Sequence, residues 1–168
     1  MADKSGKDAT FEEGAEAALY LAALDSDDLA VISALVQDAV FPVSEVQYSR
    51  RRREFALLVN RFRWDVCAAA VQAGRGSERV RSVLLLRDVQ AVQTQGVQPG
   101  GPDQVLSLLA VVFNPGPDGT GRVILTLAGG GVIALSVETL DATLKDVTRP
   151  YLAPSRHVPE HGAAEDNT

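Results

Sequence analysis

Residues 45–62 read EVQYSRRRREFALLVNRF, two segments of alternating apolar and polar character joined by a run of four arginines. Alternation with a period of two is typical of β-strands, so Glu45–Tyr48 and Glu54–Phe62 predict a hairpin whose tip is Ser49–Arg53. Side chains two residues apart share one face of a strand. The apolar residues of the second strand that share the core-facing side are Phe55, Leu57 and Val59.

A single amphipathic helix is predicted upstream of this hairpin. Ser26 is expected to be its N-cap, and Asp27 and Asp28 follow where the helix dipole favours negative charge. Apolar residues at helical spacing then form one stripe: Leu29, Ile32, Leu35, Val36 and Ala39. Phe41-Pro42 ends the helix. Before it, Leu19–Leu24 predicts a short strand, although its alanines also suit a helix.

Further strands are predicted downstream of the hairpin. Val80–Leu86 and Val89–Thr94 are separated by Arg87-Asp88, which could be a bulge or a tight turn. Residues 138–147 fit either a helix or a strand, and their threonines favour a strand. Three strands linked by short turns predict a meander: Val105–Phe113, Arg122–Leu127 and Val132–Val137.

The predicted architecture is a single α+β domain over residues 18–152. Residues 1–17 and 153–168 are small, polar and acidic, and are expected to be disordered tails because they cannot bury enough apolar area. The domain would be an antiparallel, β-rich sheet, curved or partly closed into a barrel, covered by the one N-terminal helix. A pleckstrin-like barrel is one architecture that suits this strand count.

The charge of the chain is divided unevenly. The net charge is −6, but residues 1–45 carry −8, residues 46–87 carry +7 with ten arginines, and the remainder carries −5. An acidic total argues against general adhesion to nucleic acid, whereas a local excess of arginine can attract an anionic partner.

Composition also limits the compartment and the chemistry. Cys67 is the only cysteine, which excludes an internal disulfide and fits a reducing compartment. No run approaches the ~20 apolar residues of a membrane span, and the N-terminus does not resemble a signal peptide. The sequence therefore predicts a soluble cytoplasmic protein without a membrane partner.

No catalytic, metal or cofactor constellation is apparent. His157 and His161 flank a proline in the C-terminal tail, and the folded part has no other histidine for a triad. Gly129-Gly130-Gly131 lacks the Lys-Ser/Thr ending of a phosphate loop and suits a hairpin turn instead. The acids Asp38, Asp88, Asp141 and Asp146 show no pairing that the sequence reveals. No cofactor and no metal are predicted, and the enzyme alternative has low weight.

Arginines are the candidate binding residues. Arg50, Arg51, Arg52 and Arg53 would present a dense set of donors for phosphates or carboxylates, or would simply form a solvated turn that blocks edge-to-edge pairing of sheets. Arg61 and Arg63 continue the face of Val59, where core residues are expected. Either the strand bends at Asn60, or Arg61 lies at the rim of the core with a carboxylate partner, such as an acid of the first helix, or in a ligand site. Trp64 could stack on a base beside them, although a lone tryptophan is more often core.

Three functions follow from these residues. The first is a non-catalytic binding or accessory domain that contacts an acidic protein or a phosphorylated ligand through the arginine-rich hairpin. The second is nucleic-acid binding through the same arginines, and the third is an enzyme that anchors an anionic metabolite on Arg61. A homodimer through an exposed β edge is also compatible with the pattern.

Four motifs resemble those of a small proteobacterial family of unknown function, over about residues 19–150. They are LDSDDLAVISA (residues 24–34), FALLVNRFRW (55–64), VLSLLA (105–110) and AGGGVIAL (128–135). The resemblance implies a cytoplasmic bacterial protein and no assigned activity.

Overall fold

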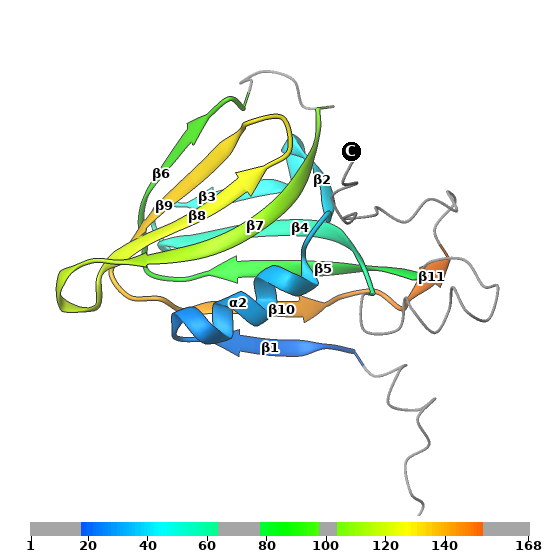
Figure 1. Ribbon diagram of the computed structural model, residues 1–168, viewed down its shortest axis with the longest axis horizontal. Helices are drawn as coiled ribbons and strands as arrows, with labels where there is room; N and C mark the ends of the chain where they lie inside the picture. The colour runs from blue at the N-terminus through cyan, green and yellow to red at the C-terminus, as the bar shows by residue number, and fades with distance from the viewer. Residues whose placement is uncertain (1–17, 64–77, 98–103, 153–168) are drawn as a thin grey trace, which may run out of the picture.

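The structure is a computed structural model that describes residues 18–63, 78–97 and 104–152 (Figure 1). Both expected tails lie outside the described residues, as do Trp64, Cys67 and both histidines.

The described residues form one antiparallel sheet of eleven strands with a single α-helix, α2 (Ser26–Leu35). Two short 3-10 turns, η1 (Val43–Glu45) and η2 (Pro117–Gly119), interrupt the strands. The strands are β1 (Tyr20–Ala23), β2 (Val40–Pro42), β3 (Val46–Ser49), β4 (Glu54–Phe62), β5 (Glu78–Leu86), β6 (Val89–Gln95), β7 (Val105–Pro115), β8 (Gly121–Leu127), β9 (Val132–Val137), β10 (Ala142–Asp146) and β11 (Tyr151–Leu152). The predicted class, α+β with an antiparallel sheet, is confirmed.

The sheet is curved and open. Its strand order is β1-β10-β5-β4-β2-β7-β8-β9-β6, with β3 added to the edge of β4 and β11 to β5. The sheet has two parts, the strands β1-β10-β5-β4-β2 and the strands β7-β8-β9-β6. The long strand β7 links them, because its first residues pair with β2 and its later residues pair with β8. Figure 1 shows β6, β9, β8 and β7 fanned above β4, β5, β10 and β1. The end strand β6 returns toward β3, where the Tyr48 hydroxyl donates to the Val89 carbonyl at 3.1 Å, without a strand ladder between them.

Helix α2 packs against β7 and β1 and contributes the buried residues Leu29 and Ile32. Its N-cap is Asp25 rather than the expected Ser26, because Asp25 has extended backbone and its carboxylate accepts the Asp28 amide at 2.8 Å. The helix also ends at Leu35, four residues earlier than expected. Asp38 adopts a left-handed conformation (φ 60°), and its amide donates to the Leu108 carbonyl at 2.7 Å, which leads the chain into β2.

Most strand predictions are confirmed. The hairpin of β3 and β4, the short strand β1 and the meander β7–β8–β9 form as expected, and residues 142–146 form β10 rather than a helix. Of the two alternatives for Arg87-Asp88, the bulge is wrong, because β5 and β6 are separate strands that pair with different neighbours. Asp88 has a positive φ of 55°, and the flanking amides donate to distant carbonyls, so the dipeptide is a corner between the two parts of the sheet.

Gly121 illustrates how tightly the β7–β8 hairpin is packed. A Cβ atom at this position would lie 2.5 Å from the Asn114 carbonyl oxygen and would overlap the Phe113 ring. We expect Gly121→Ala to lower the free energy of unfolding by about 1–3 kcal/mol, as overpacking does. Urea unfolding measures the change. Gly119→Asn is the control, since an added Cβ meets nothing within 4 Å there and asparagine tolerates the positive φ of 79°. Equal losses in both variants would contradict the steric explanation.

Candidate functional site

The arginine run lies at the turn between β3 and β4, where the sequence predicted it. The side chains of Arg50, Arg51 and Arg52 are exposed, and within the described ranges none of the three has an ion-pair partner. The Arg52 amide donates to the Ser49 hydroxyl at 3.2 Å, which holds the turn. Three guanidinium groups are therefore presented to solvent at one end of the molecule; we call Arg50–Arg52 the arginine tip.

Arg53 plays a different part from its three neighbours. It adopts a left-handed conformation (φ 56°), and its carbonyl accepts the Val89 amide at 2.9 Å. Its guanidinium pairs with Glu138, with 2.9 Å between Nη2 and Oε2. These contacts attach the hairpin to the start of β6 and to the chain after β9, so Arg53 anchors the turn that displays the other three arginines.

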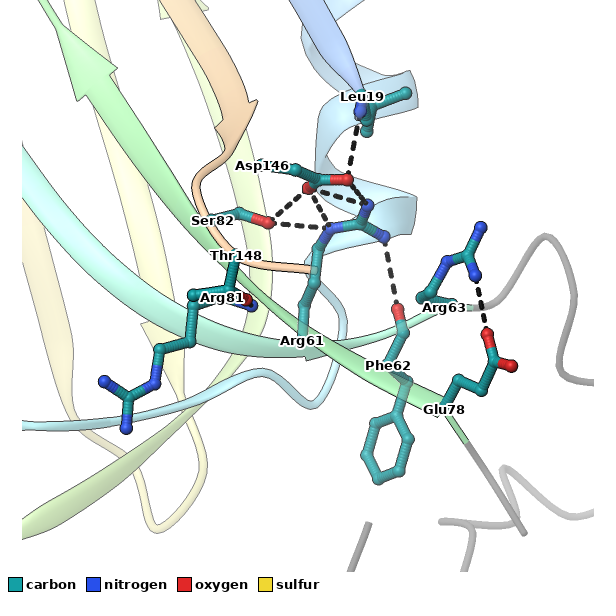
Figure 2. A network of polar contacts seen from close by, with 9 residues as sticks. All are labelled: Leu19, Arg61, Phe62, Arg63, Glu78, Arg81, Ser82, Asp146 and Thr148. Atoms are coloured by element: carbon teal, nitrogen blue, oxygen red, sulfur yellow. Dashed lines mark hydrogen bonds and ion pairs between the residues drawn. The ribbon is translucent and has the colours of Figure 1, made fainter. Parts of the chain in front are cut away.

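Arg61 is buried, with 2% of its side chain exposed, and it lies in a network of polar contacts with Asp146 and Ser82 (Figure 2). Its Nη2 lies 2.9 and 3.1 Å from the two carboxylate oxygens of Asp146, and its Nε lies 3.0 Å from the Ser82 hydroxyl. Ser82 donates in turn to Asp146 at 2.6 Å, and the Leu19 amide donates to the same carboxylate at 3.0 Å. The remaining nitrogen, Nη1, donates to the Phe62 carbonyl at 3.3 Å. Each side-chain nitrogen of Arg61 is thus hydrogen-bonded within the protein.

The expected ion pair of Arg61 is confirmed, but its suggested partner was wrong. The carboxylate comes from Asp146 at the end of β10, not from the first helix. Strand order explains the difference, since β10 lies beside β5 and β5 lies beside β4, so Asp146, Ser82 and Arg61 come together across three neighbouring strands. The guanidinium of Arg61 is therefore engaged by Asp146, Ser82 and the Phe62 carbonyl, and the structure gives no support to Arg61 as an anchor for a metabolite.

Arg63 is also mostly buried, at 6% exposure, and pairs with Glu78 through Nη1. It lies with Arg61 at the end of β4 that is opposite to the arginine tip. Because a strand rises about 3.3 Å per residue, the two ends are separated by roughly 25 Å. The structure therefore does not bring the predicted arginines into one site, and Trp64 lies outside the described residues.

Sequence reasoning missed several cations near Arg63. A cleft of about 480 Å³ is lined by Arg63, Glu78, Arg149 and Pro150. Nearby, the Arg79 guanidinium lies 4.1 Å from the centre of the Phe62 ring, while its buried Nε has no hydrogen-bond partner. Arg79 and Arg81 alternate with buried Val80 and Ser82 in β5. The alternation of the sequence therefore already indicated that both arginines lie on the outer face of this strand.

Other classes of site find no support in the part of the chain that the structure describes. Within these residues, no group of three or more histidine, cysteine, aspartate or glutamate side chains is placed to hold a metal ion. Among the residues that the structure places, no helix is long and apolar enough to cross a membrane.

Comparisons with known proteins point to a single family. No curated protein and no solved structure matches the chain. The model of one family, described as "Protein of unknown function (DUF2948)", matches residues 19–161, which include β1–β11 and the whole buried network around Arg61. The resemblance inferred from the sequence motifs is therefore confirmed at the level of the family, and the chain belongs to the DUF2948 family of proteins of unknown function.

Proposed function

We propose that the protein is a non-catalytic accessory domain that docks on an acidic surface of a partner protein through the arginine tip. The observation that carries this proposal is the contrast among the arginines that lie before, within and directly after β4. Arg53, Arg61 and Arg63 all pair with carboxylates of the protein itself, whereas Arg50, Arg51 and Arg52 are exposed with no carboxylate partner among the described residues. Guanidinium groups are well suited to bidentate recognition of carboxylates.

The surroundings of the arginine tip favour a protein over a nucleic acid. Arg53 and Arg87 are paired with Glu138 and Asp141, and Asp88 accepts from the Thr139 hydroxyl close by. These carboxylates would repel a continuous line of phosphates, and the whole chain carries −6. A partner that presents a few carboxylates to the tip and leaves the flanking acids uncovered fits this mixed pattern. The single cysteine is consistent with a partner in the cytoplasm.

Co-purification from the host lysate tests the proposal. The tagged protein is compared with the variant Arg50→Ser/Arg51→Ser/Arg52→Ser and with the control Arg122→Ser/Lys145→Ser/Arg149→Ser, which removes three exposed cations elsewhere. Three exposed charge contacts of about 0.5–1 kcal/mol each predict that the tip variant binds its partner about 10- to 100-fold more weakly, with the control unchanged.

Each lysate is also treated with nuclease before capture. A partner that resists nuclease and is lost only from the tip variant supports the proposal. Recovery that disappears with nuclease would replace it with nucleic-acid binding, and equal recovery by all three proteins would show that the arginine tip is only a solvated turn.

A further inference from the structure

A small cavity lies where the ladder along one edge of β4 is interrupted. On this edge β2 pairs with β4 only through Val40 and Asn60, and β3 begins to pair at Leu57. Between these points the chain detours through Pro42 and the 3-10 turn η1, so Leu58 and Val59 have no strand partner on this side. A cavity of about 240 Å³ occupies the interruption, lined by Val40, Phe41, Pro42, Glu45, Leu58, Val59, Asn60, Arg81 and Val105.

Three polar side chains line this cavity, one each from β4, β5 and the 3-10 turn η1. Asn60 on β4 carries a buried Oδ1 atom that has no hydrogen-bond partner. Arg81 lies directly across from Asn60 on β5, so their side chains share one face about 5 Å apart at Cβ. Glu45 lies on the opposite side of β4, in η1. Neither Arg81 nor Glu45 has an ion-pair partner among the residues that the structure places.

Arg81 is separate from the buried network of Arg61. Figure 2 shows its side chain leaving β5 away from Asp146 and Ser82. Its backbone is held by a hydrogen bond from the Arg81 amide to the Thr148 hydroxyl at 3.0 Å. The Arg81 side chain is exposed at the mouth of the cavity, and its guanidinium has no ion-pair partner among the described residues.

The chemistry of the lining defines the ligand. Asn60 lines the cavity, and its Oδ1 atom is a buried acceptor that no described donor satisfies, so the Asn60 amide has unused hydrogen-bonding capacity at the cavity wall. Asn60 Oδ1 and the Glu45 carboxylate would both receive an ammonium group, and Arg81 would receive a carboxylate. The rest of the wall is apolar, through Val40, Pro42, Leu58 and Val105. The volume lies below the ~300 Å³ at which pockets for drug-sized ligands begin, which fits a small molecule.

We propose that this cavity binds a small zwitterion with an apolar body, the chemistry of a free α-amino acid with a hydrophobic side chain. The ammonium group lies against Asn60 Oδ1 and Glu45, the carboxylate pairs with Arg81, and the side chain covers Leu58 and Val105. This site is distinct from the arginine tip, and it stands whether or not the tip binds a protein.

Binding of truncated ligands tests the pairing of charges. Leucine is titrated into the full-length protein labelled with ¹⁵N, and amide chemical shifts are followed for residues around the cavity. The probes 4-methylpentanoate and 3-methylbutylamine keep the apolar body but lack the ammonium and the carboxylate, respectively. Each lost charged hydrogen bond predicts affinity about 10- to 100-fold weaker than that of leucine. Equal binding of all three ligands, or no leucine binding with a dissociation constant below about 1 mM, would overturn the proposal.

Variants separate the site from general effects of charge. Arg81→Gln and Asn60→Val should each weaken leucine binding by at least about 10-fold. Arg122→Gln, an exposed arginine on β8 outside the cavity, should leave it unchanged. Circular dichroism confirms that each variant is folded. If Arg81→Gln and Arg122→Gln have the same effect, or if leucine shifts residues remote from β2 and β4, the assignment of this cavity is wrong.

Discussion

Asp146→Leu is expected to lower the free energy of unfolding by about 3–5 kcal/mol, because it leaves the buried guanidinium of Arg61 without its counter-charge. Asp146 accepts from Arg61, from the Ser82 hydroxyl and from the Leu19 amide, so a single substitution removes an acceptor shared by β4, β5 and the residue before β1. The charge of an arginine cannot be relieved by losing a proton at neutral pH. The buried cation must therefore either draw water into the core or force the end of β4 open.

A double-mutant cycle isolates the contribution of the pair. Arg61→Met removes the stranded charge, so the double variant Arg61→Met/Asp146→Leu should be more stable than Asp146→Leu alone, with a coupling energy of about 2–3 kcal/mol. Urea or guanidinium chloride unfolding of the two single variants and the double variant provides the measurement.

The matched control is the exposed pair of Arg53 and Glu138, whose nitrogen–oxygen distance is also 2.9 Å but whose side chains are 46% and 52% exposed. Its cycle should give a coupling energy below about 1 kcal/mol, since water and salt screen exposed pairs. Similar coupling energies in the two cycles would contradict the view that burial makes the Arg61–Asp146 pair important.

Local pattern was enough to predict most elements of the fold. The alternation around Phe55, Leu57 and Val59 identified β4 and its core-facing side, and the same alternation placed Arg61 beside the core. It failed where a long-range contact sets the conformation. The helix ends early because the amide of Asp38 bonds to Leu108 in β7, seventy residues further along the chain. No spacing within residues 26–39 contains that information.

The ion-pair partners in the candidate site also depend on long-range contacts that local sequence does not reveal. Local charge density located the arginine tip, but it could not separate Arg50–Arg52 from Arg53, because the partner Glu138 comes from a distant loop. It also could not find Asp146, since the order β10-β5-β4 joins segments that no local motif relates. The cavity beside Asn60 depends on where β2 leaves β4, which is a property of the sheet and not of either strand alone.

The two ends of β4 therefore differ, with an exposed turn of arginines at one end and a buried network of hydrogen bonds at the other. At one end, Arg53 uses its charge and its carbonyl to hold a turn with three exposed arginines that have no ion-pair partner among the described residues. At the other end, all three side-chain nitrogens of Arg61 form hydrogen bonds, and those to Ser82 and Asp146 join β4 to β5 and β10. Substitutions at the two ends should therefore separate cleanly, with partner binding affected at Arg50–Arg52 and stability affected at Arg61.

Phe41→Ala is the second substitution for which we expect a large loss, about 3–5 kcal/mol in the free energy of unfolding. Phe41 is 1% exposed and lies in β2, the short strand that connects β4 to β7. Since β2 pairs with β4 at one position and with β7 at only three, side-chain packing supplies much of the connection between the two parts of the sheet. The cavity left by alanine would weaken this connection directly.

Phe113→Ala makes the same chemical change in β7 at a partly buried position, and it provides the control. Its expected loss is smaller, about 1–2 kcal/mol, because less apolar area leaves water at that site. Hydrogen exchange adds a second measurement, in which Phe41→Ala should speed exchange of amides in β2 and in the first residues of β7 more than in β5 and β10. Comparable losses for the two phenylalanines, with uniform exchange, would mean that β2 is not the weak connection of the sheet.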